Sequence, residues 1–232
     1  AQGDEDKNYY HQLGCKNIYV TGSVKFDQGS DLRKSESLSF KKFLKHPYFL
    51  AASTHEGEDK IILDSFNLIK KDFPSVKLVV VPRHPERANK IKALFLNMRS
   101  KSIYEDEEEI SSDILIVKSL GILPTLYADA QLAFVGGSLV NRGGHNIIEP
   151  AIAQCPFILG ENYFNFKSIV ESFISANATY IVKTPLDIFK LFCKIYKNQD
   201  DFREGMIRNA NTVVEKNIGA TTRQLSLIRA SL

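Results

Sequence analysis

The chain has 232 residues, of which 44% are hydrophobic, with 30 Lys and Arg against 27 Asp and Glu. This balance is typical of a globular protein of one large or two small domains, and it excludes disordered, collagen-like and coiled-coil chains. The net charge of +3 is small and evenly spread, so we expect no nucleic-acid partner.

Short apolar or β-branched runs recur along the chain and predict buried strands. Between some of them, over residues 61–69 and 91–98, apolar residues are spaced by three and four and predict helices. Runs that are apolar without alternation suit strands covered on both faces, as in a parallel sheet flanked by helices. The sequence therefore predicts an α/β fold with a Rossmann-like, doubly wound parallel sheet. The predicted strands are residues 18–20, 48–52, 77–81, 114–117, 132–135 and 156–159.

The last part of the chain has a helical pattern only. Pro185 is suited to the first turn of a helix, and the apolar residues of 188–195 form a stripe along it. Two more helices are predicted to follow, with Thr221 or Thr222 capping the last one.

Three of the five histidines follow predicted strands at the same edge of the sheet: His55, His84 and His145. In an open parallel sheet, ligands bind beyond this carboxyl edge. A single histidine in such a loop is more often structural, but three that converge on one edge favour a binding site.

Residues 136–150 form the segment richest in glycine, with four of the 13 glycines within nine residues. Backbone amides in such a segment can approach a phosphate, and a helix that begins near Asn146 or Ile147 would present its positive end. Asn146 can cap that helix or bind a hydroxyl, and Glu149 can accept hydrogen bonds from a ribose diol. The alternative is that Gly143-Gly144 forms a tight turn and Glu149 is a solvated first-turn carboxylate.

Several catalytic motifs are missing from the sequence. It contains no G-x-x-x-x-G-K-[ST], G-x-G-x-x-G, G-x-S-x-G or H-E-x-x-H string, so a Walker-type NTPase, a typical NAD domain, an α/β-hydrolase and an H-E-x-x-H zinc site are unsupported. The three cysteines form no C-x-x-C pair and are interpreted as reduced thiols in a cytoplasmic compartment. No apolar run approaches the roughly 20 residues of a membrane span. Because the chain begins with Ala1 rather than Met, it is expected to be one piece of a larger protein.

Five strings of the sequence are long and ordered enough to compare with known families: VTGSVKFD at 20–27, AASTHEGED at 51–59, VPRHPER at 81–87, GILPTLYADA at 121–130 and FVGGSLVNRGGHNIIEPA at 134–151. Together they resemble one known family, the 3-deoxy-D-manno-octulosonic acid (Kdo) transferases that build the inner core of lipopolysaccharide in Gram-negative bacteria. Small departures from the family pattern are Asn141 and Ile147, where Pro would be expected, and neither removes a functional group.

The resemblance implies a GT-B glycosyltransferase, in which two Rossmann-like domains face each other across a cleft. Residues 1–232 would be the single C-terminal domain that binds the donor CMP-Kdo, and the N-terminal acceptor domain would lie outside this chain. That other domain would carry the general base, meet the lipid A precursor and contact the membrane, so no catalytic residue is expected here. The fragment would be soluble and inactive alone, and the full-length protein would lie at the cytoplasmic face of the inner membrane. Neither a cofactor nor a metal is expected.

The resemblance also implies roles for individual residues in a direct displacement that releases CMP. Arg83 and the backbone of Gly121, Ile122 and Leu123 would hold the cytosine. Glu149 would hold the ribose, and Asn146 the phosphate or the sugar. Lys118 and Arg142 could neutralise negative charge. The phosphate would face Gly137, Ser138, Gly143 and Gly144, and the Kdo part would lie near Ser53, Thr54 and Glu56, with His55 less certain.

Two other functions remain open at this point. The chain could be the donor domain of another GT-B transferase that uses a UDP-sugar, although fewer basic residues than expected are available for a diphosphate. It could also be a nucleotide-binding module without catalytic function.

Overall fold

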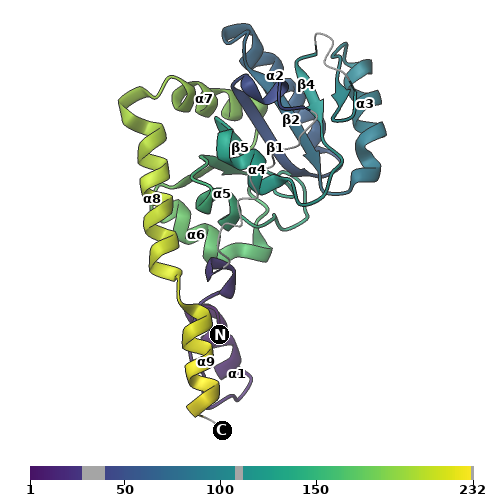
Figure 1. Ribbon diagram of the computed structural model, residues 1–232. Coiled ribbons are helices and arrows are strands. Elements are labelled where there is room, and N and C mark those ends of the chain that lie inside the picture. The colour runs from purple at the N-terminus through teal and green to yellow at the C-terminus, as the bar shows by residue number, and fades with distance from the viewer. Residues whose placement is uncertain (28–39, 108–111, 231–232) are drawn as a thin grey trace.

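The computed structural model describes residues 1–27, 40–107 and 112–230. Within these residues, seven parallel strands form one sheet in the order β3-β4-β2-β1-β5-β6-β7 (Figure 1). The strands are β1 (Tyr48–Thr54), β2 (Lys77–Pro82), β3 (Ile103–Tyr104), β4 (Ile114–Ile116), β5 (Leu132–Val135), β6 (Phe157–Leu159) and β7 (Thr179–Ile181). The predicted fold class, a doubly wound parallel α/β sheet, is therefore confirmed.

The central strand β1 is buried on both faces. Its alternate side chains belong to two different cores: Tyr48 and Leu50 pack on one face of the sheet, and Phe49 and Ala51 on the other. Helices cover both sides of each central strand, and this explains why the strand sequences are continuous apolar runs.

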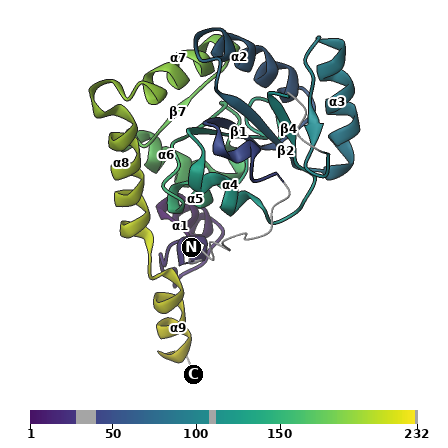
Figure 2. The same ribbon diagram turned by 45° about the horizontal axis from the view of Figure 1, so that its top comes forward.

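Helices cover the two faces of the sheet. One face packs against α2 (Glu58–Asp72), α3 (Ala88–Asn97) and α7 (Pro185–Tyr196), and α2 and α7 lie side by side there (Figure 2). The opposite face packs against α4 (Leu123–Asp129), α5 (Ile148–Ile152), α6 (Lys167–Ser175) and α8 (Phe202–Asn217). Each face therefore has its own hydrophobic core.

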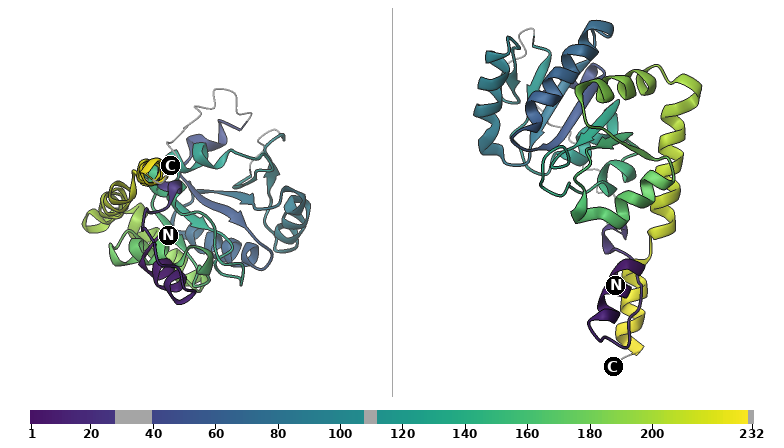
Figure 3. Two further views of the ribbon diagram at one scale, coloured as in Figure 1. Left: turned by 90° about the horizontal axis from the view of Figure 1, so that it is seen from below. Right: turned by 180° about the vertical axis from the view of Figure 1, so that it is seen from behind.

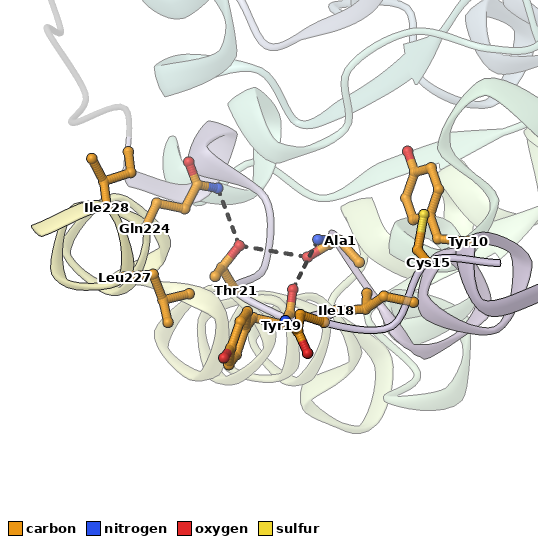
Figure 4. Close-up of a pocket in the computed structure, with 10 residues that line it drawn as sticks. Ala1, Tyr10, Cys15, Ile18, Tyr19, Thr21, Gln224, Leu227 and Ile228 are labelled. Carbon is orange, nitrogen blue, oxygen red and sulfur yellow. Dashed lines mark hydrogen bonds between the residues drawn. The ribbon is translucent and has the colours of Figure 1, made fainter. Parts of the chain in front are cut away.

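The two ends of the chain lie side by side beneath this sheet domain. Helix α8 runs along the domain and leads into α9 (Ala220–Ala230), which projects next to α1 (Asp4–Gln12) and the segment after it (Figures 1 and 3). A groove of about 430 Å³ lies between α9 and residues 1–21 (Figure 4). Thr21 lines it, and its hydroxyl accepts a hydrogen bond of 3.2 Å from Gln224 Nε2.

Three sequence-based expectations differ from the fold. Residues 18–20 form no strand, because they lie beside α9, where Tyr19 and Val20 are exposed and pair with no other strand among the described residues. The short strands β3 and β7 were not predicted. The last helix begins at Ala220, so Thr221 and Thr222 lie inside it, and the carboxylate of Asp27 accepts hydrogen bonds from the amides of Gly219 and Thr221 at 2.5 and 2.6 Å.

Candidate functional site

The strand order reverses at one point of the sheet. From β1 the chain continues to β2, then to the edge strand β3 and back to β4, which lies between β2 and β3, and it finally crosses to β5 on the other side of β1. The loops after β1 and β5 therefore leave the sheet in opposite directions, and ligands of doubly wound folds bind at such a point. Here these loops bring together His55 and the glycine-rich segment from Gly136 onward.

A buried carboxylate ties the two loops together. Glu58, in the first turn of α2, is fully buried. Its Oε2 accepts hydrogen bonds of 2.8 Å from the amides of His55 and Gly137, and its Oε1 accepts bonds of 3.0 and 2.9 Å from the amides of Ser138 and Leu139. Burial raises the pKa of Glu58, while the four amide donors oppose this rise because they stabilise the charged form.

The same contacts change the expected role of Gly137 and Ser138. Their amides were expected to face a phosphate, but both donate to Glu58. The hydroxyl of Ser138 is also internal, since it donates to the carbonyl of Val135 at 2.6 Å and accepts from the amide of Gly160 at 2.8 Å. In this structure the two amides therefore bind the carboxylate of Glu58, and they help to fix the conformation of the loop.

Two glycines allow the loops to approach each other. A Cβ on Gly136 would lie 2.3 Å from the carbonyl oxygen of Ser53, too close for any side chain. Gly137 has a φ of +71°, and a Cβ there would lie 3.2 Å from the His145 ring and 3.4 Å from the His55 ring. Glycine is thus required at position 136, and at position 137 any other residue would be strained by the positive φ.

The three histidines at this edge converge, as predicted. The Nε2 atoms of His55 and His145 are 2.8 Å apart, and the His84 ring lies 5.7 Å from the His55 ring. Burial, together with the neighbouring His55 and Arg83, lowers the pKa of His145 to about 4. Burial also lowers the pKa of His55, with smaller contributions from His84 and Arg142.

An ion pair links the segments that follow β1 and β2. Arg87 pairs with the buried Asp59, and its Nη1 donates to the carbonyl of Thr54 at 2.7 Å. Thr54 is itself fully buried, so its side chain does not line the open crevice as expected for a residue near the sugar. Ser53 is half-buried with a φ of +56°, and Glu56 is exposed.

Asn146 and Glu149 are linked to each other. Asn146 Oδ1 accepts a hydrogen bond of 3.2 Å from the amide of Ile148, the first residue of α5, and its Nδ2 donates to Glu149 Oε1 at 3.0 Å. The side chain of Asn146 thus binds the first amide of α5, while the N-cap residue of this helix is Ile147. Glu149 is exposed, so its carboxylate remains accessible to a ligand.

The remaining predicted residues lie around the same crevice edge. Arg83 is exposed after β2, and its amide donates to the carbonyl of Thr54 at 3.0 Å. Gly121, Ile122 and Leu123 lead into α4, where the last two are half-buried against the core. The turn at Gly143 and Gly144 is held by a bond of 2.9 Å from the amide of Gly144 to the carbonyl of Gly137.

The two predicted cations differ in their surroundings. Lys118 Nζ lies 3.3 Å from a carboxylate oxygen of Asp106, so its charge is already compensated. Arg142 is exposed, and within the described residues neither Arg142 nor Arg83 belongs to an ion pair. Both arginines are exposed at this edge of the sheet and are available to bind an anionic ligand.

Among the residues that the structure describes, no group of three or more His, Cys, Asp and Glu side chains could hold a metal ion. Across residues 1–27, 40–107 and 112–230, no helix is long and apolar enough to span a membrane.

Comparisons with known proteins show what this chain is related to. No family model matches it. The Kdo transferase of Haemophilus influenzae is 32% identical over 240 residues, which cover 100% of this chain and 56% of that protein. The Kdo transferase of Aquifex aeolicus is 32% identical over 186 residues, which cover 79% of this chain and 49% of that protein. The chain thus spans about half the length of these curated relatives.

A solved structure of a similar domain covers most of this chain. The C-terminal CMP-Kdo binding domain of WaaA from Acinetobacter baumannii superposes with a TM-score of 0.71 and 28% identity, over 83% of this chain and 99% of that domain. Its fold agrees with the GT-B half that the sequence strings implied. The chain is therefore similar to the 3-deoxy-D-manno-octulosonic acid transferases over about half of their length, and it has the fold of the C-terminal domain solved for one of them.

Proposed function

We propose that this chain is the donor-binding domain of a Kdo transferase and that it binds CMP-Kdo. The observation that carries this proposal is its similarity to the A. baumannii domain, which is named for CMP-Kdo binding and is matched over 99% of its length. The crevice between the loops after β1 and β5 supports it, since this is where a nucleotide is expected in a doubly wound sheet.

The geometry suggests how the parts of the donor are held. The exposed carboxylate of Glu149, oriented by Asn146, is suited to the ribose hydroxyls. Arg142 is suited to the phosphate and to the carboxylate of Kdo. The cytosine would lie near Arg83 and residues 121–123.

In the full-length protein, we propose that an acceptor hydroxyl of a lipid A precursor attacks the anomeric carbon of Kdo. The bond from that carbon to the phosphate oxygen breaks, and CMP leaves. The general base, the acceptor site and the membrane contact would belong to the other domain, at the cytoplasmic face of the inner membrane. Fixed cationic groups that face the leaving phosphate stabilise the charge that develops on it.

Titration of the ¹⁵N-labelled chain with CMP, CDP and UDP tests the donor assignment. We expect CMP to bind best and to shift the amides of residues 143–149 and of the loop after β1. Tighter binding of UDP than of CMP would contradict the proposal and favour a transferase that uses a UDP-sugar.

A further inference from the structure

The contact between His55 and His145 limits how many protons the two rings can hold. Their Nε2 atoms are 2.8 Å apart, a distance at which one nitrogen must carry a hydrogen and the other a lone pair. Two imidazolium rings would place two N–H groups against each other, so the His55–His145 pair can hold at most one positive charge while this contact exists.

Three arginines and a third histidine contribute to the electrostatic environment of the pair. Arg83 and His84 from the loop after β2, Arg87 from the 3-10 turn beyond it and Arg142 from the glycine-rich loop all act on it. Three of the neighbouring carboxylates already have partners within the protein, and a fourth, Glu56, is next to His55 in sequence and exposed. Glu58 binds four backbone amides, Asp59 pairs with Arg87, and Glu86 lies 3.8 Å from His84 Nδ1. These groups and burial lower the pKa of both rings, so the pair is neutral near pH 7 without a ligand.

In the neutral pair, only one of the two Nδ1 atoms carries a hydrogen that could be donated to an anion. The ring whose Nε2 donates has a bare Nδ1, and only the ring whose Nε2 accepts carries a hydrogen on Nδ1. One added proton would fill the bare Nδ1 without breaking the contact between the Nε2 atoms. The pair would then have a positive charge and N–H donors on both Nδ1 atoms.

We propose that the affinity of the His55–His145 pair for one proton from solvent rises when the anionic part of the nucleotide binds beside it. This inference rests on the proposed function, because it concerns the same crevice and the same ligand. An anion beside the rings offsets the positive field of the arginines, and an opposite charge within about 4–6 Å shifts a titration by roughly 1–3 pH units. Donor binding would thus be linked to protonation, and release of the nucleotide would return the proton.

NMR titration of all five imidazoles tests the proposal directly. The chain labelled at its histidine rings is titrated with acid and base in three states: free, saturated with CMP, and saturated with cytidine, which has no phosphate. We expect the pKa of the pair to rise by one unit or more with CMP and by less than 0.3 with cytidine. His11 and His46, exposed and on other parts of the chain, are internal controls and should not change in any state.

The outcomes separate this inference from the proposed function. If CMP shifts the crevice amides while the pair titrates as in the free protein, the inference is wrong and donor binding stands. If CMP shifts no amides, the proposed function fails and the inference fails with it. An equal rise with cytidine would also overturn the inference, because the phosphate would then not be the cause. The phosphate of CMP titrates near pH 6 but is followed separately by its ³¹P signal.

Discussion

At the scale of single residues, Glu58 shows how a charged side chain can organise a loop from inside the protein. Its four hydrogen bonds come from amides at positions 55 and 137–139, on loops that follow two different strands. A buried carboxylate is costly unless its oxygens are fully paired, and here four backbone donors supply the partners. The loop after β5 therefore has a fixed conformation before any ligand arrives.

Replacement of Glu58 tests this role. In Glu58→Gln, one of the two oxygens becomes an NH₂ group that cannot accept from the amides of Ser138 and Leu139 or of His55 and Gly137. Leaving buried amides unsatisfied costs about 1–3 kcal/mol each, so for two amides we expect the free energy of unfolding to fall by about 2–6 kcal/mol. Urea unfolding followed by circular dichroism measures it.

The neighbouring exposed carboxylate provides a matched control. Glu56→Gln, two residues away, should change the free energy of unfolding by less than about 0.5 kcal/mol, as is usual for surface substitutions. Equal stability of the two variants would mean that the four amides find other partners and that Glu58 does not hold the loop.

Glu149→Gln separates ligand binding from folding. The exposed carboxylate makes only local contacts, so its loss should change helix stability by less than about 1 kcal/mol. A hydrogen bond between a hydroxyl and a charged acceptor contributes about 1.5–3 kcal/mol, so the affinity for CMP should fall about tenfold or more. Calorimetry with CMP measures this, with the exposed Glu215→Gln on α8 as the control. Unchanged affinity would show that Glu149 does not hold the ribose.

At the scale of elements, the sequence predicted those strands and helices whose patterns are long enough to be distinctive. The runs at 48–52 and 132–135 match β1 and β5, because both strands are buried on two faces. The edge strands β3 and β7 have only two and three residues in the structure and are half-exposed, so they have no comparable pattern. The run at 18–20 looks like a strand in sequence, but its apolar residues lie beside α9 instead.

The candidate site was predictable only in part, for a physical reason. Histidines that follow neighbouring parallel strands must come to the same edge, so their convergence follows from the sequence. The bonds of Glu58 join residues 79–81 positions apart, and their geometry arises only when β1 and β5 pair. The glycine-rich string predicts amides that face a phosphate, which stays a prediction, but it does not indicate that the amides of Gly137, Ser138 and Leu139 bind the carboxylate of Glu58.

The start of α7 offers a test of local capping. Thr184 Oγ1 accepts from the amide of Asp187 at 3.2 Å, and Asp187 Oδ2 accepts from the amide of Thr184 at 2.9 Å. Removing such a cap costs about 1 kcal/mol, so Thr184→Ala should lower the free energy of unfolding by that amount. Thr212→Ala, at an exposed position within α8, should cost less than about 0.5 kcal/mol. The urea midpoints of the two variants measure these changes. If both variants lose the same stability, Thr184 does not act as a cap.

At the scale of the whole molecule, polar contacts join the beginning and the end of the chain. Arg223 Nε donates to the carbonyl of Thr21 at 2.9 Å, and the carboxylate of Asp27 caps α9 from 192 and 194 residues away in sequence. Many side chains on α1, α9 and the segment between α1 and Asp27 are exposed. The position of α9 therefore depends more on these directed bonds than the position of the sheet helices does.

Asp27→Asn should loosen α9 without unfolding the sheet. The amides of Thr221 and Gly219 hold the pKa of Asp27 below its usual 3.8, so the ionised form is the one that binds α9. Because the folded-state pKa is lowered, this stabilisation is complete above pH 3.8 and is lost as the pH falls through the lower folded-state value. At pH 7, where the contribution is complete, hydrogen exchange should become at least tenfold faster for α9 amides in the variant and remain unchanged for β1 and β5, since local opening reports local stability. Asp64→Asn, at a carboxylate that pairs with Lys60 on the surface of α2, is the control and should leave α9 unaffected. Unchanged exchange in α9 of Asp27→Asn would show that apolar contacts along the groove hold the two ends of the chain together, rather than the cap.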